Sequence, residues 1–146
     1  MQKKLAVIMI FLLLLIAGCH IDPSNPYSFR QEFSEISSIE ILLQNDTYSS
    51  WDERFSLLLT LEASKHNDFV SDLSEIKGQP FFNPPPTSFD KYVIRITYKN
   101  GEEEYISRDN NGYKTPGSKL CLDTYWFSDK EGFYKLLSEY SGLEIK

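Results

Sequence analysis

Histidine and cysteine are scarce in this chain. Each occurs twice among 146 residues, and the four side chains show none of the short spacings that hold metal ions. The sequence also has no glycine-rich phosphate loop and no G-x-S-x-G nucleophile elbow. We therefore expect a noncatalytic protein without a metal or cofactor. Carboxylates are plentiful, so a small hydrolase that acts through an acidic pair is the enzymatic alternative.

Basic side chains are too few to suit a nucleic acid. Lysine and arginine number 15 against 21 acidic residues, which gives a formal net charge of −6 at pH 7. A nucleic-acid ligand requires a basic face that neutralises its phosphates. We therefore expect no nucleic acid among the partners of this protein.

Long apolar runs are limited to one, from Leu5 to Ile16, with Lys3 and Lys4 before it and small residues after it. This run falls short of the roughly 20 residues that span a bilayer. A positive start, an apolar centre and small residues at the end are typical of a secretory signal peptide.

The end of this run, Leu15-Ile16-Ala17-Gly18-Cys19, resembles the lipobox of bacterial lipoproteins. The resemblance implies that residues 1–18 are a signal peptide, cleaved between Gly18 and Cys19, and that Cys19 carries two or three acyl chains. It also implies an extracytoplasmic protein of the cell envelope, anchored to a bacterial membrane. Each buried methylene adds about 0.8 kcal/mol, so such an anchor is essentially permanent. An ordinary cleaved signal or an uncleaved anchor, with Cys19 incidental, is the alternative.

The mature chain is expected to begin with a tether. Residues 19–28 are interpreted as the lipidated cysteine and a flexible linker, because Pro23 and Pro26 accompany a segment without apolar period. Residues 29–146 are long enough for one domain with a single core.

Two single residues invite a chemical interpretation, Cys121 and His66. Cys121 has no partner once Cys19 is lipidated, and it lies between two leucines. That setting favours a buried strand over a reactive thiol. No other metal ligands surround His66 in the sequence, so we expect this histidine at the surface.

Two stretches alternate apolar and polar residues with a period of two. Ile39, Ile41 and Leu43 share one face of the first stretch, and the apolar residues Phe55, Leu57, Leu59 and Leu61 share one face of the second. Turn-forming residues separate the two stretches, which predicts an antiparallel pair of strands.

The dipeptide Asn100-Gly101 predicts a β-hairpin between strands 92–98 and 103–108. A two-residue turn at this dipeptide would place Ile96 opposite Tyr105.

Apolar residues at helical spacing predict two helices. The first is expected to follow an N-cap at Asn67 and to end at Gly78. The second is expected to follow a capping box of Ser128 and Glu131 and to end at Gly142.

The remaining segments connect these elements. Pro84–Pro86 predict a stiff crossover, residues 109–118 a long loop, and residues 119–127 a further strand. In chain order the elements predict an α+β fold, with an antiparallel sheet of about five strands and two helices packed on one face.

The function expected from these patterns is binding at the membrane surface. The uncovered sheet face, or the aromatic residues Trp51, Tyr113, Tyr125 and Trp126, would contact an envelope protein, a peptide or a small ligand. The alternatives are a structural subunit of an envelope complex and, less favoured, a small extracytoplasmic hydrolase or inhibitor.

Overall fold

A computed structural model of the chain describes residues 27–47, 53–80, 89–123 and 125–145. Within these ranges the elements are, in order, η1 (Phe33–Glu35), β1 (Ile36–Gln44), β2 (Phe55–Thr60), η2 (Ala63–Lys65), α2 (His66–Glu75), β3 (Gly78–Pro80), β4 (Tyr92–Tyr98), β5 (Glu103–Ser107), β6 (Asn111–Lys114), β7 (Cys121–Asp123), β8 (Tyr125–Phe127) and α3 (Lys130–Ser141). The predicted signal peptide, Cys19, Trp51 and Pro84–Pro86 lie outside the described residues.

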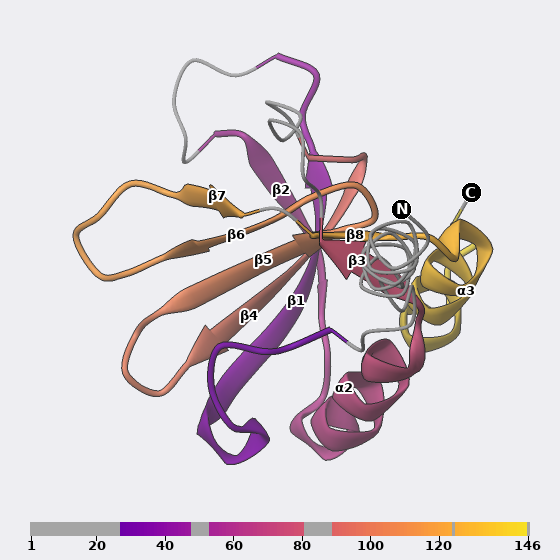
Figure 1. Cartoon of the computed structure of the whole chain (residues 1–146), viewed down its shortest axis with the longest axis horizontal. Coiled ribbons are helices and arrows are strands. Elements are labelled where there is room, and N and C mark those ends of the chain that lie inside the picture. Colours follow the sequence, from indigo (N-terminus) through magenta and orange to yellow (C-terminus); the bar gives the residue numbers. More distant parts are fainter. Residues whose placement is uncertain (1–26, 48–52, 81–88, 124, 146) are drawn as a thin grey trace, which may run out of the picture.

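The strands form one large antiparallel sheet and one small one. The large sheet has the order β2-β1-β4-β5-β6-β7, and β3 pairs with β8 in a separate two-stranded sheet (Figure 1). The predicted α+β class is confirmed. The sheet has six strands because residues 111–114 form β6, where the sequence predicted a loop. The predicted strand over residues 119–127 is instead divided, because β7 pairs with β6 whereas β8 pairs with β3.

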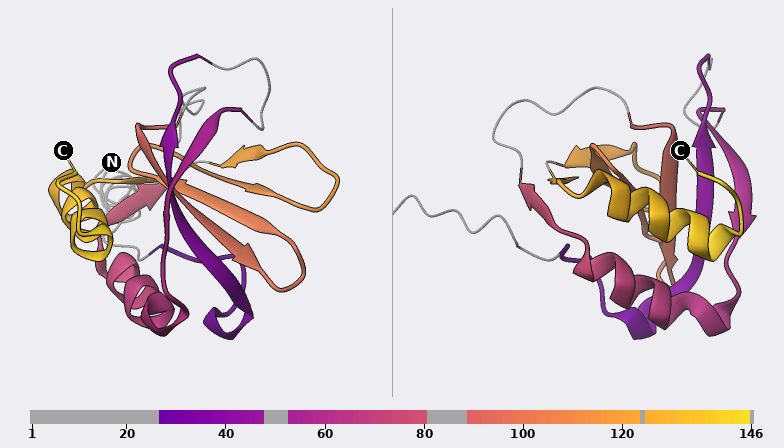
Figure 2. Two further views of the ribbon diagram at one scale, coloured as in Figure 1. Left: turned by 180° about the vertical axis from the view of Figure 1, so that it is seen from behind. Right: turned by 90° about the vertical axis from the view of Figure 1, so that its right-hand side faces the viewer.

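Both helices cover the same face of the large sheet, as Figure 1 and Figure 2 show. The core between the layers consists of buried apolar side chains from both helices and from the interior strands. The helices contribute Phe69, Val70, Leu73, Phe133 and Leu137, and the strands contribute Ile39, Ile41, Ile94, Ile96 and Ile106. Each of these side chains contributes about 1.5–3 kcal/mol when it is fully buried, so this layer contact stabilises the fold.

The ends of α3 are only partly as predicted. Its N-cap is Asp129 rather than Ser128, and the Asp129 carboxylate accepts a hydrogen bond of 2.9 Å from the Gly132 amide. The helix ends at Gly142 in the left-handed conformation, with φ of 69°, as its sequence predicted. A residue with a side chain rarely adopts this conformation, so glycine suits this position.

The first helix departs further from prediction. It begins at His66, directly after η2, so Asn67 lies inside it and the N-cap residue Lys65 makes no side-chain capping bond. The helix ends at Glu75, and Gly78 starts β3 instead. His66 is buried rather than at the surface, with 9% of its area exposed and Nε2 3.3 Å from the carbonyl oxygen of Leu61.

The predicted hairpin forms, but with a different register. The Gly101 amide donates to the Tyr98 carbonyl and the Tyr98 amide donates to the Glu102 carbonyl, both at 2.9 Å, so three residues form the loop. Gly101 has φ of 82°, which suits the left-handed residue of such a loop. Ile96 therefore lies opposite Glu104, not opposite Tyr105. A shift by one residue exchanges the two faces of a strand, and this shift brings Glu104 to the helix-covered face.

A bulge in β2 separates apolar residues that the sequence predicted on one face. Ile41 pairs with Leu59 and Leu42 pairs with Leu57, so Leu58 has no partner in the register. Leu59 consequently packs against the helix-side core, whereas Phe55 packs against apolar residues on the other face. The bulge thus supplies apolar side chains to both sides of the sheet.

Candidate functional site

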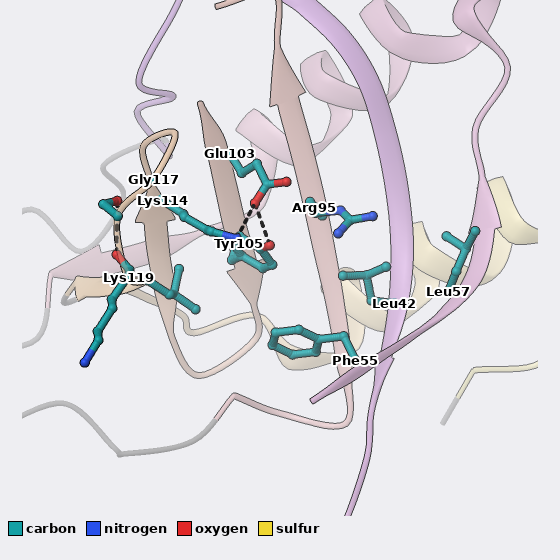
Figure 3. A pocket seen from close by; sticks show the side chains of 11 residues that line it. Leu42, Phe55, Leu57, Arg95, Glu103, Tyr105, Lys114, Gly117 and Lys119 are labelled. Atoms are coloured by element: carbon teal, nitrogen blue, oxygen red, sulfur yellow. Dashed lines mark hydrogen bonds and ion pairs between the residues drawn. The ribbon is translucent and has the colours of Figure 1, made fainter. Parts of the chain in front are cut away.

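The sheet face opposite the helices carries a pocket of about 590 Å³ (Figure 3). Its floor comes from β1, β4 and β5, and its sides come from β2 and from the connection between β6 and β7. The lining residues are Leu42, Phe55, Leu57, Arg95, Glu103, Tyr105, Lys114, Gly117, Ser118, Lys119 and Leu120.

One part of the pocket is apolar. Leu42 is buried against Val93 and Tyr105, and Phe55 stacks on Tyr105 with the ring centroids 5.6 Å apart. Leu57 stands at the edge with 58% of its area exposed. Leu42, Phe55 and Tyr105 belong to a second apolar cluster, which the sheet separates from the core under the helices.

The other part of the pocket is a polar row that crosses the strands. Arg95 Nη2 and Nε lie 2.5 Å and 2.6 Å from Glu40 Oε2. The Tyr105 hydroxyl donates to Glu103 Oε2 over 2.8 Å, and Lys114 Nζ lies 3.9 Å from the same oxygen. Burial, followed by the hydrogen bond to Glu103, raises the pKa of Tyr105 to about 12. The hydroxyl therefore stays protonated at neutral pH.

This arrangement places apolar side chains beside convergent polar groups, and ligand-binding pockets use both kinds of group. Comparison with protein-family models, with curated proteins and with solved structures finds no match for this chain. The site is accordingly interpreted from its own geometry.

Two further classes of site are absent from the part of the chain that the structure describes. No group of three or more histidine, cysteine, aspartate or glutamate side chains there could hold a metal ion. No helix in the same ranges has the length and hydropathy for a membrane crossing.

Of the four aromatic residues predicted as a binding site, the three that the structure describes do not line this pocket. Tyr113 lies on β6 beneath the Arg30 guanidinium, whose carbon is 3.3 Å from the ring centroid. Tyr125 packs into the core, where its ring lies 5.0 Å from that of Tyr27. Trp126 is half-buried in β8, and Trp51 lies outside the described residues. The structure therefore does not bring Tyr113, Tyr125 or Trp126 into the lining of the pocket.

Cys121 is exposed at the edge strand β7, contrary to the expectation of a buried thiol. Its two leucine neighbours explain the error, because Leu120 and Leu122 both pack against the uncovered-face cluster. The intervening residue of the strand must point to the other side.

The helix-covered face holds a buried polar cluster formed around Glu104, which is 2% exposed. Tyr27 OH donates to Glu104 Oε1 over 2.5 Å, and the Tyr98 hydroxyl donates to Oε2. The Arg30 amide donates to Oε2 over 3.2 Å, and Asn111 Nδ2 donates to Tyr27 OH over 3.2 Å. Burial raises the pKa of Glu104, while the hydrogen bonds from both tyrosines oppose that rise. Tyr27, which the sequence assigned to the tether, is thus part of the packed domain.

Sequence reasoning missed the residues of the pocket. The alternation within residues 92–98 placed Val93 and Arg95 on the face opposite Ile94 and Ile96, which was the one available signal. Leu57 lines the pocket because of the bulge in β2, and the sequence pattern did not predict that bulge.

Proposed function

We propose that this chain is a lipid-anchored protein of the bacterial cell envelope whose domain binds a ligand noncatalytically on its uncovered sheet face. The resemblance of residues 15–19 to a lipobox supports the anchor. The pocket supports the binding function, because its volume of about 590 Å³ falls in the range of roughly 300–1,000 Å³ common for small-molecule sites.

The pocket is the single observation that carries the binding proposal. An uncovered face that was charged throughout would suit a solvated surface. Here the buried Leu42 and the stacked pair of Phe55 and Tyr105 form an apolar part of the pocket beside the polar row. Apolar area that a ligand can remove from water contributes about 25 cal/mol per Å², so this apolar part can supply affinity.

The anchor is tested with Cys19→Ala, and Cys121→Ala is the matched control because Cys121 is the other cysteine. We expect the Cys19 variant to remain an unprocessed precursor that incorporates no labelled palmitate, and the Cys121 variant to be processed and labelled normally. Normal cleavage together with normal membrane partition of the Cys19 variant would contradict the anchor.

The binding site is tested by thiol protection in the full-length, membrane-bound protein. Leu57→Cys places a reporter in the pocket and Leu143→Cys places one outside it. Both leucines are exposed, at 58% and 45%, so a reagent can reach either position. Each variant also carries Cys121→Ala, which removes the other exposed thiol. The probe is neutral 4-phenylbutanol, and the readout is the rate of alkylation by iodoacetamide, followed by peptide mass spectrometry. We expect saturable protection of Cys at position 57 and none at position 143; equal rates with and without the probe would refute the pocket as a binding site.

A further inference from the structure

The chemistry of the polar row points to a class of ligand. We infer that the pocket takes a small amphipathic carboxylate, with its apolar body on Leu42, Phe55 and Tyr105 and its carboxylate between Arg95 and Lys114. This inference rests on the proposed binding function and adds the charge of the ligand.

Cationic side chains outnumber anionic ones in the lining of the pocket, which contains Arg95, Lys114 and Lys119 but only Glu103 as a carboxylate. Arg95 carries five N–H donors and Lys114 carries three. Glu40 Oε2 receives two of the Arg95 donors, and Glu103 Oε2 receives the Tyr105 hydroxyl. Lys114 Nζ is 3.9 Å from Glu103, which is beyond hydrogen-bond distance. Arg95, which also interacts with the Tyr105 hydroxyl, and Lys114 have more N–H donors than these contacts use. A ligand carboxylate can accept from the remaining donors.

The position of Lys114 agrees with this role. Its side chain runs across the pocket toward Tyr105 and Glu103, whereas the Lys119 side chain points away (Figure 3). Lys114 is the last residue of β6 and Lys119 lies in the connection that follows it. The two lysines are therefore close in the chain, but their side chains point in different directions. Arg95 and Lys114 thus place two cationic side chains in the lining of the pocket, although the chain as a whole has a net charge of −6.

A small molecule fits this pocket better than an added peptide strand. Strand addition requires a regular free edge, and the edge beside the pocket is β2, a strand of six residues with a bulge at Leu58. Short and bulged edges disfavour pairing with another strand. The connection between β6 and β7 closes the opposite side of the pocket, which limits the length of an occupant.

The experiment compares three probes with one apolar body: 4-phenylbutyrate, 4-phenylbutanol and 4-phenylbutylammonium. Each is titrated against the Leu57→Cys reporter in the full-length, membrane-bound protein described above. We expect the carboxylate to protect at a concentration about three- to tenfold lower than the alcohol, and the ammonium compound to protect least, since one partly exposed ion pair has this order of effect. Higher salt should reduce the preference.

Three substitutions assign the preference to residues. Lys114→Gln should remove most of the preference for the carboxylate, and Lys119→Gln is the matched control that should keep it. Glu103→Gln should strengthen carboxylate binding about threefold or more, because it removes a competing negative charge near Lys114.

The outcomes separate the two proposals. If no probe protects position 57, the pocket is not a binding site and both proposals fail. If all three probes protect equally, or if Lys119→Gln has the same effect as Lys114→Gln, the pocket binds ligands but the carboxylate inference is refuted.

Discussion

Replacement of Tyr27 by phenylalanine should destabilise the domain out of proportion to the single atom that it removes. Tyr27 is 5% exposed, and its hydroxyl donates to Glu104 over 2.5 Å and accepts from Asn111 over 3.2 Å. The ring contacts with Phe29 and Tyr125, both at 5.0 Å, remain available to phenylalanine. The variant therefore isolates the loss of the hydrogen bonds.

The expected magnitude follows from burial and charge. A hydrogen bond to a charged group contributes about 1.5–3 kcal/mol, and a neutral one about 0.5–1.5 kcal/mol. Loss of both bonds of Tyr27 should lower the free energy of unfolding by about 2–4 kcal/mol. Tyr140→Phe is the matched control, because the Tyr140 hydroxyl also bonds a carboxylate, Asp72, at 2.6 Å, but in an exposed setting. Its loss should cost less than about 1 kcal/mol.

The effect should also depend on pH. Burial raises the pKa of Glu104, so the native state holds this proton more tightly than the unfolded chain. The contribution of Glu104 to stability is then present below the unfolded pKa and is lost as pH rises through the folded pKa. Tyr27 donates to the ionised form, so Tyr27→Phe should raise the Glu104 pKa further and make this loss larger.

The assay is urea unfolding of the purified protein, followed by fluorescence and repeated from acidic to neutral pH. We expect the difference between Tyr27→Phe and the wild type to shrink as pH falls. A loss below about 0.5 kcal/mol at neutral pH, or a loss equal to that of Tyr140→Phe, would refute the role assigned to the buried cluster.

Three further predictions concern other parts of the fold. Gly101→Ala places a side chain at φ of 82° and should cost about 1–2 kcal/mol; unchanged urea unfolding would contradict the three-residue loop. Asp129→Ala should cost about 1 kcal/mol through loss of the α3 cap, and Ser128→Ala should cost less in the same assay. The pKa values of Tyr105 and Tyr125 are raised to about 12 by burial. Because the folded pKa values lie above the unfolded value near 10, the free energy of unfolding should fall as pH rises from about 10 to 12. Absorbance titration should show both tyrosines ionising above pH 10. Ionisation of all tyrosines near pH 10 in the folded protein would contradict this.

Local patterns in the sequence predicted the α+β class, the antiparallel hairpin and the end of α3 at Gly142. These features depend on residues close together in the chain, such as the left-handed glycine after an apolar helix. The same patterns could not predict that β3 pairs with β8, because residues 78–80 and 125–127 meet only through the tertiary fold.

The lining residues of the pocket were not predicted because two one-residue insertions, one in the loop at Gly101 and one in β2, decide which side chains face it. The loop at Gly101 shifted the β5 register, so Glu103 and Tyr105 joined Arg95 on the uncovered face. The bulge at Leu58 turned Leu57 to that face as well. An Asn-Gly pair favours a two-residue turn but also fits a three-residue loop with glycine last, and sequence alone did not distinguish them.

The buried bond between Tyr27 and Glu104 also determines where a mechanical load enters the domain. A pull from the amino-terminal side reaches Tyr27 and Arg30 before it reaches any strand. Their hydrogen bonds lead to Glu104 on β5 and to Asn111 on β6, which are both interior strands of the sheet. If a lipid on Cys19 holds the chain, a pull on that anchor acts first on the interior strands β5 and β6 through these hydrogen bonds.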